Sequence, residues 1–161
     1  MKILPYILYL FLFTFFATII SDMVSIFGTM VDLLIIIVVM VGFYKSETEA
    51  VWFGVVSGIV AGATHLSLMP WEIFILTLII LVVNQIGGRI NLESVVSKIF
   101  ILGCCTIVHG VVITLAISPN EFFFMLVRYI LPGTAYTLVI GSIIFFVKDG
   151  YITWTKIKAL F

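Results

Sequence analysis

Few side chains inside the long apolar stretches of this chain could do chemistry. Those with an ionisable or amide group placed well inside a stretch are Asp32, His65, Asn84, Gln85, His109 and Arg128. An ionisable side chain in hydrocarbon costs about 2.5–3.5 kcal/mol on insertion scales and usually faces the interior of a helix bundle. These residues are therefore the first candidates for a site.

Asp32 and Arg128 carry opposite charges, and each stands a few residues into an apolar stretch, near the same expected side of the membrane. We expect them to lie at similar depth, where they could pair. In a transporter the pair would form a substrate or proton site. The structural alternative is an ion pair that locks two helices, or two side chains that extend to the outer interface, and we favour it. With His109, they are the predicted buried polar residues.

The chain lacks the residue patterns of known catalytic and metal sites. No H-E-x-x-H motif accompanies His65 or His109, so we interpret both as packing or hydrogen-bonding groups rather than as metal ligands or a proton relay. Cys104 and Cys105 are adjacent and lack metal-ligand spacing. Ser57 is not in a G-x-S-x-G elbow, and there is no P-loop. We predict no catalytic residues, no metal, no cofactor and no enzymatic activity.

The amino-acid composition indicates whether these residues are surrounded by water or by lipid. Of 161 residues, 63% are apolar, and eight Lys+Arg balance eight Asp+Glu. A soluble domain is about 45–50% apolar and about 25% charged, so this chain is predicted to be an integral membrane protein. A net charge of zero argues against a nucleic-acid partner, which would need a clustered basic surface.

The apolar stretches predict an all-α membrane protein with one domain, residues 1–161. They do not alternate with the period of barrel strands, so we expect six transmembrane helices. A kink or unwound turn is expected at Pro132-Gly133. The predicted spans are residues 3–21, 27–44, 50–69, 71–87, 97–117 and 122–147, followed by a tail, 148–161, that is either an interfacial helix or a frayed end.

The basic residues predict the orientation of the six spans. Seven of the eight would lie on one side of the membrane, and the eighth, Arg128, lies inside the last span. Positive residues near span ends stay in the cytoplasm, so both termini are predicted to be cytoplasmic. The first stretch is longer than the apolar core of a signal peptide, and we expect it to be retained. The seven residues are Lys2, Lys45, Arg89, Lys98, Lys148, Lys156 and Lys158.

The third span carries a stripe of small residues. Gly54, Gly58 and Gly62 recur every fourth position, with Ser57 and Ala61 beside them. Such a face lets another helix approach to backbone contact. It is either a docking face for a partner's helix or a contact within the chain's own bundle, and we favour the second.

The order of these features resembles the MreD family of bacterial rod shape-determining membrane proteins, over nearly the whole chain. The similar features are the Asp32 that opens the second span, the Gly-x-x-x-Gly of the third span, the polar stretch at 91–94 and the pair Leu131-Pro132. The chain departs from the family where Val31 replaces a Pro and where residues 61–63 lack an Asp. Only the role of Asp32 is therefore carried over.

The resemblance implies a fold and a function. The fold would be a compact six-helix bundle similar to the substrate-binding components of energy-coupling-factor transporters. The function would be a non-enzymatic scaffold in the cytoplasmic (inner) membrane that binds MreC and helps organise peptidoglycan synthesis and rod shape, with MreB, RodA and a class B penicillin-binding protein. The alternative is a vitamin-binding transport component, with candidate ligands Asp32, His65, Trp71, Glu72 and Arg128.

Overall fold

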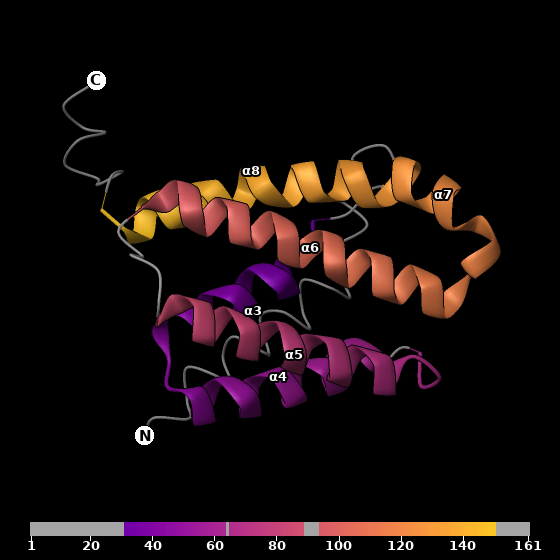
Figure 1. Ribbon diagram of the computed structural model, residues 1–161, viewed down its shortest axis with the longest axis horizontal. Coiled ribbons are helices and arrows are strands. Elements are labelled where there is room, and N and C mark those ends of the chain that lie inside the picture. The colour runs from indigo at the N-terminus through magenta and orange to yellow at the C-terminus, as the bar shows by residue number, and fades with distance from the viewer. Residues whose placement is uncertain (1–30, 64, 89–93, 151–161) are drawn as a thin grey trace.

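The computed structural model describes residues 31–63, 65–88 and 94–150, and every regular element within them is helical (Figure 1). Three stretches there are long and apolar enough to cross a membrane: Met69–Gly87, Val95–Ile117 and Pro119–Lys148. They support the assignment of the chain as a helical membrane protein. The predicted span at 3–21, the start of the span at 27–44 and the tail from 151 lie outside the described residues.

The helices follow the predicted spans with shifted ends. α3 (Leu33–Tyr44) ends where the second span was expected to end, and α5 (Met69–Gly87) and α6 (Val95–Ile117) each begin two residues early. α4 (Glu47–Gly62) begins earlier and stops well before residue 69, so it is not among the three long apolar helices. The six-span count therefore stays a prediction.

The last stretch contains the irregularity that Pro132 was expected to cause. After a 3-10 turn, η2 (Pro119–Glu121), it continues through α7 (Phe122–Met125), a π-helical turn, η3 (Leu126–Ile130), and α8 (Leu131–Lys148). A proline ring clashes with the carbonyl four residues earlier in an α-helix. Here the Leu131 N–H bonds to the Leu126 carbonyl, five residues back, so the helix is wider just before the proline.

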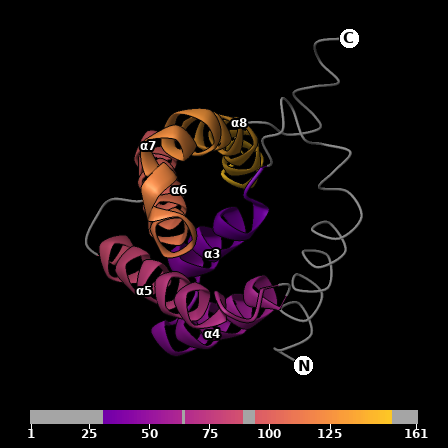
Figure 2. The same ribbon diagram turned by 90° about the vertical axis from the view of Figure 1, so that its right-hand side faces the viewer.

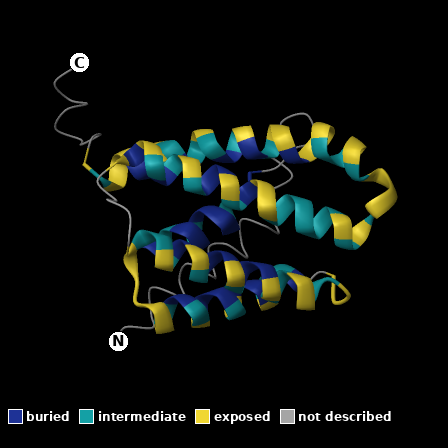
Figure 3. Cartoon of the chain, in the orientation of Figure 1, coloured by how far each residue is buried: buried dark blue, intermediate teal, exposed yellow. Residues whose placement is uncertain are grey.

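α3 forms the centre of the bundle. α4 and α5 lie on one side of it, and α6 and α8 lie on the other (Figures 1 and 2). Most of its twelve residues are buried, on all sides of the helix (Figure 3). A helix that is apolar all round is stable only when it is enclosed, and two flanking helix pairs enclose it.

The glycine stripe of α4 packs against α5. A Cβ added at Gly58 would lie 2.7 Å from the backbone nitrogen of Ile73, and one added at Gly54 would lie 3.0 Å from the Thr77 Cα. At Gly62 it would meet Met69. The favoured alternative, a contact within the chain's own bundle, is confirmed at these glycines, and the alternative of a partner's helix in the stripe is not, because α5 already occupies it.

The lysines of the described residues gather at one end of the bundle, which we call the lysine end. It holds Lys45 after α3, Lys98 in the first turn of α6 and Lys148 at the end of α8 (Figure 1). This is the grouping that the basic residues predicted. That the lysine end faces the cytoplasm follows from the positive-inside rule alone and stays a prediction.

Candidate functional site

Asp32 begins the central helix and joins it to α8. Its backbone N–H donates to the Thr137 hydroxyl oxygen at 2.9 Å, and its carboxylate Oδ1 accepts from the Ile35 backbone N–H at 3.1 Å. The second bond is an N-cap, which satisfies one of the donors left free at a helix start. One carboxylate oxygen is thus used within α3, and the other is free to reach a neighbouring helix.

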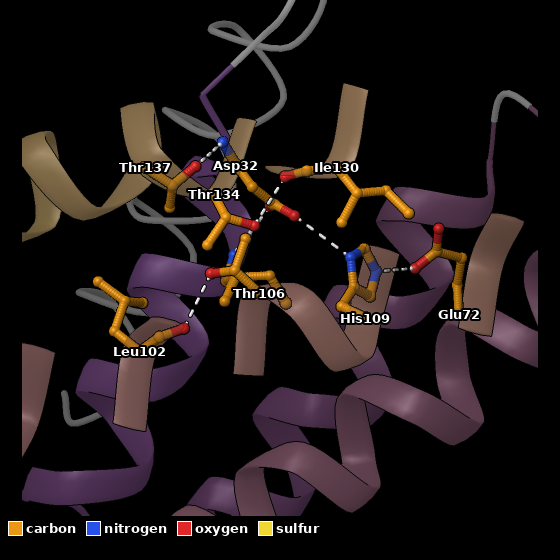
Figure 4. Close-up of polar contacts among 9 residues, drawn as sticks. Asp32, Glu72, Leu102, Thr106, His109, Ile130, Thr134 and Thr137 are labelled. Carbon is orange, nitrogen blue, oxygen red and sulfur yellow. Dashed lines mark hydrogen bonds and ion pairs between the residues drawn. The ribbon is translucent and has the colours of Figure 1, made fainter. Parts of the chain in front are cut away.

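That other oxygen meets His109 of α6. The two atoms, Asp32 Oδ2 and His109 Nδ1, lie 3.2 Å apart, and His109 Nε2 lies 2.9 Å from Glu72 Oε2 of α5 (Figure 4). The side chains are 13% exposed at His109, 12% at Glu72 and 27% at Asp32. A histidine ring is therefore held between two carboxylates from two other helices.

Together, Thr137, Asp32, His109 and Glu72 form a continuous set of contacts that we call the polar chain. It connects α8, α3, α6 and α5 in that order (Figure 4). Because the helices come from distant parts of the sequence, the polar chain exists only in the folded bundle. Polar contacts between helices stabilise a membrane bundle, where lipid provides no alternative partners.

The polar chain lies at a depth expected for hydrocarbon. His109 is fourteen residues from the start of α6, and Glu72 is fifteen residues from the end of α5, distances of about 21 Å and about 22 Å along the helix axes. Both helix ends belong to the lysine end. The hydrocarbon core of a bilayer is about 30 Å thick, so the polar chain would lie in the half of that core that is farther from the lysine end.

The hydroxyl groups beside the polar chain bond to their own helices. Thr106 donates to the Leu102 carbonyl at 2.9 Å, and Thr134 donates to the Ile130 carbonyl at 2.8 Å (Figure 4). Such bonds to the carbonyl four residues earlier leave the hydroxyl hydrogen engaged. The acid–base groups of the cluster are therefore the two carboxylates and the imidazole.

The pair expected between Asp32 and Arg128 is not formed. Asp32 pairs with His109, whereas Arg128 is exposed, with its guanidinium 5.5 Å from the centre of the Phe124 ring and 6.0 Å from that of Tyr129. The prediction that Arg128 is buried is corrected. It lies twenty residues, about 30 Å of helix, from Lys148, which fits the alternative of a side chain extending to a membrane interface, here the one far from the lysine end.

The other residues singled out from the sequence have separate positions. His65 is exposed in the connection between α4 and α5, and Trp71 and Gln85 are exposed on α5. Asn84 is engaged: its amide donates at 2.9 Å to the carbonyls of Gly42 and Lys45, which have no helical partner at the end of α3.

Sequence reasoning missed the part played by Glu72. The sequence analysis named it only as a candidate ligand for the transport alternative, at the second residue of the span predicted at 71–87. Counting residues from the lysine end would have matched its depth to that of His109. The sequence signal that could have found the Glu72–His109 contact is therefore the equal distance of the two residues from one end of the bundle. Using it requires knowing where each of the two antiparallel helices begins and ends.

A second polar cluster, at the lysine end, joins α3, α6 and α8. Lys98 Nζ lies 2.5 Å from Asp149 Oδ2 and 3.1 Å from the Tyr44 hydroxyl, and that hydroxyl donates to Asp149 Oδ1 at 3.2 Å. Lys148 Nζ lies 3.4 Å from the centre of the Tyr44 ring. We call these four residues the lysine-end cluster.

Within residues 31–63, 65–88 and 94–150, no group of three or more His, Cys, Asp or Glu side chains is arranged to hold a metal ion. Cys104 and Cys105 are both free thiols there. No protein-family model, curated protein or solved structure matches the chain.

Proposed function

We propose that this chain is a non-enzymatic scaffold of the bacterial cell-elongation complex, in the cytoplasmic membrane, with MreC as its direct partner. The observation that carries the proposal is the position of Asp32. It is the residue that the resemblance to the MreD family carries over, and it begins the central helix and joins three other helices through the polar chain.

The arrangement of the polar groups supports a packing role. The buried ionisable side chains of the described residues connect helices to one another: the polar chain joins four, and the lysine-end cluster joins three. A scaffold works by presenting a defined surface, and interhelical polar contacts of this kind hold helices in one arrangement. The proposed further partners are MreB, RodA and a class B penicillin-binding protein.

The second candidate function is a substrate-binding component of a small-molecule transporter. Its supporting observation is that Asp32 and Glu72, two of the candidate ligands, meet at His109 inside the bundle. A charged group inside a membrane protein frequently marks a transport pathway. This candidate predicts that a small vitamin raises the melting temperature of the purified protein, whereas the scaffold predicts no such shift.

The test is co-purification of the chain with one named partner, MreC. The full chain with an affinity tag is co-expressed with the MreC encoded in the same genome, which carries a second tag, and the complex is isolated in mild detergent. Retention of MreC through two successive tags supports the scaffold. Its absence, with capture of a transport ATPase identified by mass spectrometry, would overturn the scaffold in favour of the transporter.

The choice of variant in that test follows from the packing. A bulky residue at Gly58 would disrupt the chain's own contact between α4 and α5, so it does not report on a partner. Asp32→Asn instead keeps the shape of the side chain and removes its charge. The matched control is His65→Gln, because His65 is exposed and outside both clusters. We expect reduced MreC recovery for Asp32→Asn and unchanged recovery for the control.

A further inference from the structure

We propose that Asp32, His109 and Glu72 form a proton-binding site, in which one proton is held as a His109 imidazolium between the two carboxylates. The inference concerns the chemistry of the bundle interior and stands or fails independently of the proposed scaffold function. It assigns a ligand, the proton, to side chains that the scaffold function uses only as contacts between helices.

The geometry at the two ring nitrogens carries the argument. Nδ1 is 3.2 Å from an oxygen of Asp32, and Nε2 is 2.9 Å from an oxygen of Glu72. A neutral imidazole has one N–H and one lone pair, whereas an imidazolium has two N–H donors. A neutral ring would direct its lone pair at one of the carboxylate oxygens, but the imidazolium satisfies both of them.

The balance of charge supports the same assignment. Two carboxylates beside a neutral imidazole carry a charge of −2, and one bound proton reduces it to −1. Burying ionised carboxylates without a compensating positive charge is strongly unfavourable. Within the described residues, the ion pairs of Asp32 and Glu72 are both with His109, so the ring is the place where that positive charge can reside.

The elements packed around the ring contribute no competing cation to these contacts. α3 contributes Asp32 and α5 contributes Glu72, whereas α8 presents the hydroxyl of Thr134 and η3 presents Ile130 (Figure 4). The nearest basic residues on the packed helices are placed elsewhere. Arg128 is exposed beside Phe124, and Lys98 and Lys148 belong to the lysine-end cluster.

The experiment observes the ring nitrogens directly. The full chain is labelled with ¹⁵N-histidine, placed in lipid nanodiscs at neutral pH and studied by NMR, which distinguishes a ring nitrogen that carries hydrogen from one that does not. The chain has two histidines, and His65→Gln removes one signal set and so assigns the other. We expect both nitrogens of His109 to carry hydrogen. A His109 ring with one bare nitrogen would overturn the proposal.

Variants test whether the carboxylates hold the proton. Asp32→Asn and Glu72→Gln each leave one carboxylate, and we expect His109 to keep both hydrogens in either variant. The double variant removes both, and we expect one ring nitrogen to lose its hydrogen. Retention of both hydrogens in the double variant would contradict the assignment. If that variant does not fold, the measurement on the unmodified chain decides the question alone.

Discussion

The helix pairs on the two sides of α3 are assembled in different ways. Between α4 and α5, a Cβ at Gly58 would lie 2.7 Å from the Ile73 backbone nitrogen, so backbone meets backbone. Between α6 and α8, a Cβ at Gly103 would lie 3.3 Å from the end of the Leu138 side chain. The first pair is joined by close approach at glycines, whereas the second pair meets through side chains.

The difference shows two solutions to one physical problem. Apolar contact alone drives helix association weakly in lipid, because lipid tails are as apolar as leucine. α4 and α5 gain close van der Waals packing along the glycine stripe. α6 and α8 are instead joined to α3 and to each other by the polar chain and the lysine-end cluster. Substitutions should therefore affect the two sides through different interactions.

The largest effect is expected at the glycine contact. Gly58→Ala places a methyl group against the α5 backbone, which must shift, and overpacking of this kind costs about 3 kcal/mol at the upper end of its usual range. Unfolding of the purified protein in mixed micelles measures the decrease in the free energy of unfolding. The matched control is Gly103→Ala, where the Leu138 side chain can move aside, and the loss should be below about 1 kcal/mol. Equal losses at the two glycines would remove the distinction between the pairs.

A smaller effect is expected at the lysine-end cluster. Lys98→Met leaves Asp149 without its cation. Breaking a buried ion pair costs about 3–5 kcal/mol of folding stability. Because the Asp149 side chain is 17% exposed, we expect the free energy of unfolding to fall by about 2 kcal/mol. The double variant Lys98→Met with Asp149→Leu should recover most of that stability in the same unfolding assay. A double variant that is less stable than Lys98→Met alone would show that the pair is not the source of the loss.

A still smaller effect is expected where α5 meets the end of α3. Asn84→Leu removes two hydrogen bonds to the carbonyls of Gly42 and Lys45, and interhelical hydrogen bonds in membranes average about 0.6 kcal/mol each. We expect a loss of about 1 kcal/mol. Gln85→Leu, at the exposed neighbouring position, is the control and should leave the unfolding midpoint unchanged.

The smallest effect is expected at the cation above Tyr44. Lys148→Met removes a cation–π contact with its ammonium 3.4 Å from the ring centre, and an exposed contact of this kind contributes about 0.5 kcal/mol. Lys148→Arg keeps the cation and should keep the stability. If the Met and Arg variants unfold alike, the contact contributes nothing to the comparison between the two sides.

The helix positions followed from the sequence more closely than the contacts between them. Long apolar runs must be helices in lipid, and the proline at 132 implied an irregular turn, which the structure has at Leu126–Ile130. The end of α4 at Gly62 was not foreseen, because no glycine or proline follows it before Pro70, yet residues 66–68 form a turn and α5 begins at Met69.

The partners of the buried charges could not be read from the chain. Asp32 and Arg128 were expected at similar depth, but Asp32 is twelve residues, about 18 Å of helix, from Tyr44 at the lysine end, whereas Arg128 is twenty residues, about 30 Å, from Lys148. His109 and Glu72 then become its neighbours. An error of one helical turn in a start position changes which side chains meet, because each residue adds about 1.5 Å of depth.

The sequence by itself determined that the chain is a helical membrane protein and that its described lysines gather at one end of the bundle. Those properties depend on how apolar each stretch is and on where the basic residues lie between the stretches. The hydrocarbon of a membrane imposes both on any chain of this kind. Only the tertiary structure decided that α5 fills the glycine stripe and that His109 lies between Asp32 and Glu72. Those facts depend on which faces of separate helices meet, and that is set by packing between segments far apart in the sequence.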